Sequence, residues 1–159
     1  VNETVVFTFM ALFFINEFVV GATTADVLFD LSVAELARAG QDGSPAMDRM
    51  SRLVRHLLDQ RSFYPLYPPN PAVPVDHEHM ASLTLPMAPD LLILPSQLRY
   101  FVKNVDDILV INPGQVAKGT HGELTVQPLN LEALGEDMDK IPNLLFGRTR
   151  MEIMEAKGR

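Results

Sequence analysis

The chain has 159 residues, which is enough for one domain of common size or for a piece of a larger one. Hydrophobic residues make up 47% of it, so the chain can supply a sizeable core, and this argues against general disorder. The 13 Lys and Arg residues and 20 Asp and Glu residues give a net charge of -7, the opposite of the basic balance of a nonspecific nucleic-acid binder. The sequence has no cysteine, which excludes disulfides, zinc knuckles, iron–sulfur clusters and thiol catalysis.

The first part of the chain is strongly apolar. Thr4 to Ile15 carries no charge, but its 12 residues fall short of the roughly 20 that a membrane-spanning helix needs. No basic region precedes it, as a signal peptide would require. We therefore expect a buried strand or helix here. A truncated or misjoined start is the alternative, and a membrane anchor is the least favoured.

Four elements are expected in the next part of the chain. The fourth is the best marked, because its apolar residues recur at helical spacing. Its arginines could contact a partner or phosphate, but a solvated face is the favoured interpretation. The four are a strand over Glu17–Val20 that ends at Gly21, a short helix over Ala25–Leu31 capped by Thr23 or Thr24 with Asp26 as capping acid, a helix that begins at the capping box of Ser32 and Glu35 and ends at Gly40, and a helix that follows Ser44 and Pro45 and carries apolar residues from Met47 to Leu58.

A proline-rich segment follows. Five of the ten residues from Pro65 to Pro74 are proline, which excludes a regular helix or a central strand. Tyr64 and Tyr67 bracket its start. Because aromatic side chains at this density are rarely left in water, we expect an ordered crossing loop rather than a flexible linker.

The second half of the chain has the pattern of a layered α/β protein. Apolar runs alternate there with a polar segment that has helical character, and the order strand, helix, strand indicates packed layers. After Leu129 the sequence becomes charged, and we expect one or two short helices over Asn130–Arg159. The expected elements are strands over Asp90–Leu94, Asp107–Ile111 and Glu123–Val126, a helix over Gln97–Lys103 capped by Ser96, and a turn at Asn112–Gly114.

Only one dense cluster of groups could bind a metal. It is Asp76–His79, where His77 and His79 would point the same way in an extended segment. Spacing fixes no third ligand, because His121 and Asp26 lie too far along the chain to be placed, so a solvated loop is favoured. The sequence contains no GxSxG, P-loop or GxGxxG motif. The residues alone therefore indicate an α/β piece with no visible active site.

Four motifs of the sequence carry a resemblance to a known family. In this order they resemble those of the B subunits of DNA polymerase alpha, the accessory subunits of the polymerase alpha–primase complex. The resemblance runs from Ile15 to about Val126. The motifs are Phe18–Gly21 followed by Thr23, Thr24, Asp26, Leu28 and Phe29; Gln60–Pro69 (QRSFYPLYPP); Pro89–Lys103 (PDLLILPSQLRYFVK); and Ile111–Gly114 followed by Ala117–Gly119.

The resemblance implies a fold class and a division of the chain. The fold class is α/β, as the C-terminal portion of a degenerate calcineurin-like phosphodiesterase sandwich that is incomplete on its own. Residues 15–129 would form this part of an inactive phosphodiesterase-like domain. Residues 1–14 are an unassigned apolar segment, and residues 130–159 are a divergent charged tail.

The resemblance also implies an absence of catalysis. Active members of the phosphodiesterase superfamily keep two metal-binding histidines where this chain has Ser96 and Leu98. Leucine cannot bind a metal and neutral serine is a poor replacement for imidazole, so we expect no catalytic residue, no metal and no cofactor. The alternative is an active metal-dependent phosphoesterase that uses His77, His79 and His121.

The role implied is that of a non-catalytic nuclear scaffold in DNA replication. It would tether the polymerase alpha catalytic subunit, and primase through the complex, during initiation. DNA would be bound only weakly or through the complex, and no membrane is involved. Five residues are candidates for binding the partner, provided that they are exposed. For each of them the alternative is ordinary packing in the core or a loop. The five are Tyr64, Tyr67, Arg99, Tyr100 and Phe101.

Overall fold

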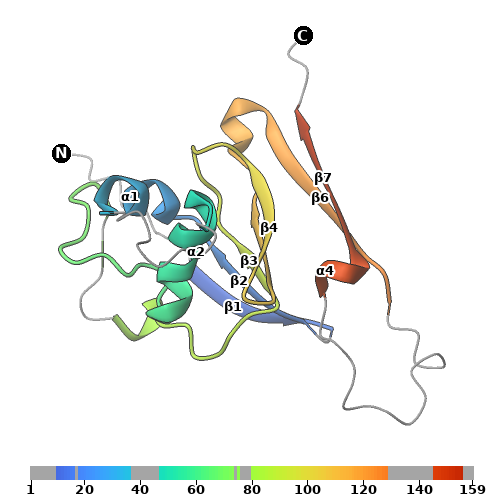
Figure 1. Cartoon of the computed structure of the whole chain (residues 1–159), viewed down its shortest axis with the longest axis horizontal. Helices are drawn as coiled ribbons and strands as arrows, with labels where there is room; N and C mark the ends of the chain where they lie inside the picture. The colour runs from blue at the N-terminus through green and yellow to red at the C-terminus, as the bar shows by residue number, and fades with distance from the viewer. Residues whose placement is uncertain are drawn as a thin grey trace, which may run out of the picture.

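The computed structural model describes residues 10–16, 18–36, 47–73, 75, 80–128 and 145–155. Within them the chain forms seven strands, three α-helices and two short 3-10 helices, η1 and η2. Figure 1 shows their arrangement. In chain order they are β1 (Met10–Ile15), β2 (Phe18–Thr23), α1 (Val27–Ala34), α2 (Arg49–Asp59), η1 (Met80–Leu83), β3 (Leu91–Ile93), β4 (Phe101–Val105), β5 (Ile108–Asn112), η2 (Val116–Lys118), β6 (Thr120–Val126), α4 (Leu145–Arg148) and β7 (Thr149–Glu155).

A mixed five-stranded sheet forms the centre of the described structure. Its strand order is β1-β2-β3-β5-β4. The three inner strands are parallel, with Val20 beside Leu91 and Leu91 beside Leu109. Both outer strands run antiparallel to their neighbours. A separate antiparallel ribbon is formed by β6 and β7.

The two faces of the sheet are covered differently. Side chains alternate along each strand, so in β5 Val110 joins the core under the helices and Leu109 joins the core on the opposite face. Helices α1 and α2 cover the first face, and the β6–β7 ribbon with α4 lies against the second (Figure 1). All five residues of β5 are buried, as expected of an inner strand. The structure is therefore of the mixed α/β class, as predicted, with a second small sheet.

The apolar N-terminal segment ends in a strand. Met10–Ile15 pairs with β2 along its whole length, so the expectation of a strand or helix is met for these residues. Phe13, Phe14 and Ile15 are exposed rather than buried, because β1 is one of the two outer strands of the sheet. Among the described residues, no helix is long and apolar enough to cross a membrane.

The predicted end of the next strand at Gly21 is wrong. Strand β2 continues through Gly21 to Thr23. A Cβ atom at Gly21 would lie 3.0 Å from Leu92 Cδ1 and 3.5 Å from the ring of Phe63. The glycine therefore marks a close approach between the sheet and its covering layer, not a turn.

The predicted helix boundaries around residue 30 also need correction. Asp26 is the N-cap of α1, since its Oδ1 accepts from Phe29 N–H at 3.1 Å. Ser32 lies inside this helix, where its hydroxyl donates to the Phe29 carbonyl, and Glu35 follows its last turn. The two therefore form no capping box. The positions predicted to stop one helix and start the next, Gly40, Ser44 and Pro45, lie outside the described residues.

Helix α2 matches its predicted apolar pattern but begins later than expected. Its N-cap is Asp48, whose Oδ1 accepts from Met50 N–H at 3.1 Å and from Ser51 N–H at 3.3 Å. Its residues Leu53, Val54 and Leu57 are fully buried in the core. The following segment, residues 65–73, has neither helix nor strand, as its prolines predicted, and is called the proline loop below.

The helix predicted over Gln97–Lys103 is wrong. Residues Phe101–Val105 form strand β4, which pairs with β5 through a two-residue turn. Asp106 and Asp107 both have positive φ (51° and 64°), as a type I′ hairpin turn requires. The aromatic and β-branched residues of β4 suit a strand, and pairing with β5 outweighs the weak helical signal.

The described part of the tail, residues 145–155, is more regular than its composition indicated. A short helix is present, as predicted, at α4, but residues Thr149–Glu155 form a strand that was not predicted. This strand pairs with all seven residues of β6, from Thr120 opposite Glu155 to Val126 opposite Thr149. Because its partner lies more than 20 residues away, the pairing left no local signal.

Candidate functional site

The strongest candidate for a functional site is the edge at which the three parallel strands end. In open α/β sheets ligands bind outside the carboxyl ends of parallel strands. Strands β2, β3 and β5 end together here, and Thr23, Ser96 and Asn112 are buried at their ends. We call this group, together with Asp26, the carboxyl-edge cluster.

Asn112 is the centre of the carboxyl-edge cluster. Its side chain is fully buried, and its Oδ1 accepts from Ser96 N–H at 3.0 Å and from Gly114 N–H at 2.9 Å. Its Nδ2 donates to the carbonyls of Leu98 and Arg99, each at 3.3 Å. One amide therefore joins the segment after β3 to the turn after β5.

The other polar members of the cluster are also engaged with the backbone. Asp26 accepts from Gln97 N–H through Oδ2 at 2.8 Å, which ties the start of α1 to the segment after β3. Thr23 accepts from Ala25 N–H at 3.1 Å, and Ser96 Oγ accepts from Leu98 N–H at 3.1 Å. No buried side-chain polar atom of the described residues lacks a hydrogen-bond partner. The cluster is thus a closed network that joins loops.

The residues in this cluster do not fit a divalent metal. Of the two positions that the family resemblance assigns to metal-binding histidines, Ser96 already accepts a hydrogen bond and Leu98 packs against the helix-side core. Across the described part of the chain, no three His, Asp or Glu side chains are grouped so as to hold a metal. His121 is exposed on β6, while His77 and His79 lie outside the described residues.

A second polar network lies between α1 and the proline loop. The Tyr64 hydroxyl donates to Asp30 Oδ2 at 2.9 Å and accepts from Asn70 N–H at 3.1 Å. The Asn70 side chain donates to Asp30 Oδ1 at 2.7 Å. Burial raises the pKa of Tyr64, and the hydrogen bond and charge of Asp30 raise it further. No local pattern in the sequence indicates this network, because Asp30 is far from both partners in the chain.

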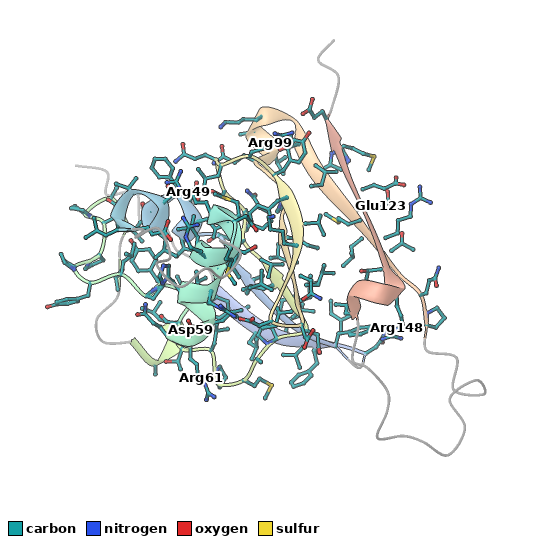
Figure 2. All side chains as sticks on the ribbon, in the orientation of Figure 1. Arg49, Asp59, Arg61, Arg99, Glu123 and Arg148 are labelled. Carbon is teal, nitrogen blue, oxygen red and sulfur yellow. The ribbon has the colours of Figure 1, made fainter. Side chains whose placement is uncertain are left out.

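The structure separates the five candidate partner-binding residues. Tyr64 is only 5% exposed, so it is a core residue and cannot offer a free surface. Tyr67 is 91% exposed and Tyr100 is 40% exposed. Arg99 is exposed, and Figure 2 shows it at one end of the sheet, with Arg61 near the other end. Phe101 is half-buried at the start of β4, beside the helix-side core.

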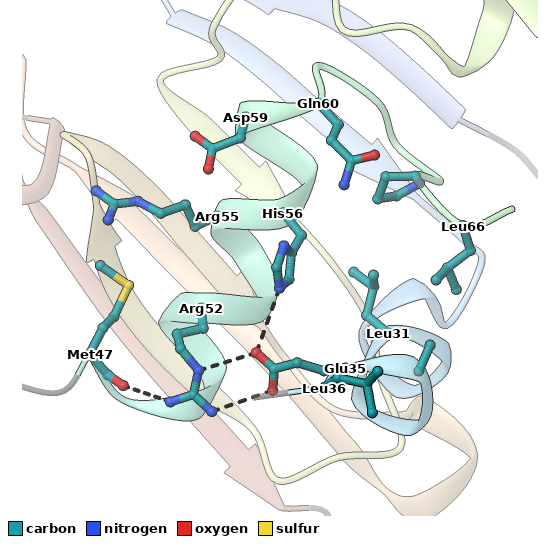
Figure 3. A pocket seen from close by; sticks show the side chains of 12 residues that line it. Leu31, Glu35, Leu36, Met47, Arg52, Arg55, His56, Asp59, Gln60 and Leu66 are labelled. Carbon is teal, nitrogen blue, oxygen red and sulfur yellow. Dashed lines mark hydrogen bonds and ion pairs between the residues drawn. The ribbon is translucent and has the colours of Figure 1, made fainter. Parts of the chain in front are cut away.

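A groove that sequence reasoning missed runs between α1, α2 and the start of the proline loop. It has a volume of about 540 Å³, with apolar side chains such as Leu31 and Leu66 on one wall and charged residues of α2 on the other (Figure 3). Glu35 accepts from Arg52 Nε at 3.1 Å and lies 3.6 Å from His56 Nε2. The hydrogen bond from Arg52 lowers the pKa of Glu35.

The basic face of α2 is occupied by contacts within the chain. Arg49 donates to the Ser32 carbonyl at 2.8 Å, Arg52 pairs with Glu35, and Arg55 pairs with Asp106 at 2.7 Å. Each of these guanidinium groups therefore has a partner already. This fits the predicted solvated face better than a phosphate-binding surface.

Comparison with known proteins identifies the family. Residues 11–103 match the family of the B subunits of DNA polymerases alpha and epsilon. Among the relatives is the B subunit of DNA polymerase alpha from Rattus norvegicus, 41% identical over 109 residues, which make up 68% of this chain and 18% of the relative. The corresponding B subunits of Schizosaccharomyces pombe and Saccharomyces cerevisiae are 39% and 28% identical over 91% and 76% of this chain, and 26% and 22% of the relatives.

The chain thus spans about a fifth to a quarter of the length of these relatives. The family match extends across α1, α2 and the inner strands β2 and β3, and it ends within β4. More than half of the residues lie inside that match. The chain therefore belongs to the family of the DNA polymerase alpha and epsilon B subunits.

Proposed function

We propose that this chain is part of a non-catalytic accessory subunit of the DNA polymerase alpha–primase complex. The subunit would hold the polymerase alpha catalytic subunit, and primase through the complex, during initiation of DNA replication in the nucleus. Its relatives carry the name of the polymerase alpha B subunit, which supports this role. The phosphodiesterase-like part of the chain would have a degenerate catalytic site and would serve as a scaffold.

The carboxyl-edge cluster is the observation that carries this proposal. A metal-dependent phosphoesterase needs side chains that bind a metal and an open position for its water. Here Asn112 fills the edge and uses its donors and acceptor on the chain's own backbone. A side-chain amide in this position holds loops together, which is what a scaffold requires.

Association with the catalytic subunit is the primary test. The full-length subunit that contains this chain is expressed with and without the polymerase alpha catalytic subunit, and their co-elution is followed by size-exclusion chromatography and mass photometry. We expect a one-to-one complex. Separate elution at micromolar concentration would contradict the proposed scaffold role.

The alternative, a metal-dependent phosphoesterase using His77, His79 and His121, needs a separate assay. Hydrolysis of bis(p-nitrophenyl) phosphate is measured with Mn²⁺ and with Zn²⁺, together with metal content. We expect no turnover above that of the free metal. Turnover that disappears together with bound metal in a His77→Ala, His79→Ala variant would establish the alternative instead.

A further inference from the structure

The proline loop presents one fully accessible aromatic side chain. Tyr67 is 91% exposed and lies between half-buried Leu66 and exposed Pro68. Residues 62–73 contain no charged side chain, and the loop stands out from the body of the molecule beside α1 (Figure 1). A single exposed aromatic side chain is common on protein surfaces, so the exposure of Tyr67 is informative only together with the order of the loop that carries it.

The loop that carries Tyr67 is held by more contacts than its exposure would lead one to expect. Asn70 bonds through its backbone and its side chain to Tyr64 and Asp30, and its Oδ1 also accepts from Ala72 N–H at 3.0 Å. Asp30 and Tyr64 are themselves only 9% and 5% exposed. The phenol ring of Tyr67 is therefore displayed from a backbone fixed on both sides.

Preorganisation of this kind favours binding. A partner that captures an already ordered loop does not have to order it, and that ordering is a main cost of association. Tyrosine is also among the residues that most often dominate protein–protein binding energy, because its ring fills an apolar pocket while its hydroxyl reaches a polar group. Helix α1, which anchors the loop, also carries two exposed apolar side chains, Phe29 and Val33, which are 36% and 74% exposed.

The absence of charge in the loop narrows the class of partner. A nucleic-acid contact needs cations close to the stacking ring, since phosphate neutralisation supplies most of its affinity. The uncharged proline loop offers none. We propose that Tyr67 is an anchor residue that inserts into an apolar pocket on a protein partner, and that the Asp30–Tyr64–Asn70 network holds it ready.

This inference rests on the proposed function, so its test uses the full-length subunit and the polymerase alpha catalytic subunit. Affinity is measured by biolayer interferometry for the wild type, Tyr67→Ala, Tyr67→Phe and Val116→Ala. Val116 is the control, since it is also apolar and 81% exposed but lies in η2. We expect Tyr67→Ala to weaken binding by about tenfold or more, Tyr67→Phe by less, and Val116→Ala not at all.

A second variant tests the anchoring. Asn70→Ala keeps Tyr67 but removes the side-chain bond to Asp30 and the acceptor of Ala72 N–H, so it should weaken binding and speed hydrogen exchange at the amide of residue 72. Binding by Tyr67→Ala equal to that of the wild type would overturn the inference while leaving the scaffold role intact. Loss of single-stranded DNA binding in Tyr67→Ala, with protein binding unchanged, would overturn it in favour of a nucleic acid. If the wild type bound no catalytic subunit, the proposed function and this inference would fail together.

Discussion

Asn112→Ala tests whether one buried amide holds the carboxyl edge together. The substitution removes the acceptor of two backbone N–H groups, at Ser96 and Gly114, and the donor to two carbonyls. A buried donor left without a partner costs about 1–3 kcal/mol, and the two longer bonds of 3.3 Å contribute less. We therefore expect the free energy of unfolding to fall by about 2–5 kcal/mol, a large share of the stability of a typical domain.

This loss is measured by urea denaturation followed by circular dichroism. It should appear as a lower urea midpoint, with the slope of the free energy of unfolding against urea concentration unchanged. Asn104→Ala is the matched control, because Asn104 is exposed on β4 and makes no side-chain hydrogen bond with the described residues. The control should change the free energy of unfolding by no more than about 0.5 kcal/mol. A loss below about 1 kcal/mol in Asn112→Ala, or one equal to the control, would refute the reasoning, since unsatisfied buried N–H groups cost more than that.

Asn112→Asp adds a dependence on pH. The new carboxyl keeps the acceptor but turns its second oxygen toward the Leu98 and Arg99 carbonyls, so burial and repulsion raise its pKa in the folded state. A raised folded pKa stabilises the fold below the unfolded value of about 3.9, and this stabilisation is lost as pH rises through the folded pKa. The loss of free energy of unfolding relative to the wild type should therefore be larger at pH 7 than at pH 4. An equal loss at the two pH values would contradict this geometry.

Three further predictions concern stability. Tyr64→Phe should lower the free energy of unfolding by about 1–3 kcal/mol, since buried Asp30 loses a donor, and an unchanged urea midpoint would count against this. The hydrogen bond from Arg52 lowers the pKa of Glu35 in the folded state, so the stabilisation of the fold by this carboxylate is complete above the ordinary pKa of 4.5 and disappears as pH falls through the folded pKa. Glu35→Gln should therefore remove part of the loss of melting temperature at acid pH. A plot of melting temperature against pH that runs parallel to that of the wild type would contradict this. Gly114→Ala should cost about 1–2 kcal/mol or more, because φ is +82° there, and a melting temperature equal to the wild type would show that the turn relaxes.

The inner strands can be predicted because their signal is local. Asp90–Leu94 and Asp107–Ile111 are continuous apolar runs, and both contain strands of the parallel core. The same holds for α2, whose buried residues Leu53, Val54 and Leu57 follow helical spacing. Elements whose identity depends on a distant partner cannot be predicted in this way. The local pattern at β4 favours a helix, and the residues of β7 carry no pattern that indicates a strand.

Local capping signals proved ambiguous for a similar reason. Ser32 and Glu35 have the spacing of a capping box, but the apolar residues before them are buried against the sheet, which draws Ser32 into α1. Glu35 then becomes available to Arg52, 17 residues away, and it lines the groove. Tertiary packing therefore decides both where the helix ends and which acid is free to form an ion pair.

The two polar networks show why the site itself could not be predicted from sequence. Asn112 is predicted to begin a turn, which it does, but the sequence does not reveal that its side chain also spans to the segment after β3. Asp30 has the pattern of an ordinary polar residue in a short helix, yet it anchors a loop 40 residues away. In both cases a buried polar side chain satisfies the backbone or side chain of a segment distant in sequence, and burial makes the bond costly to lose. The position of an exposed loop is only as fixed as the hydrogen bonds that hold it.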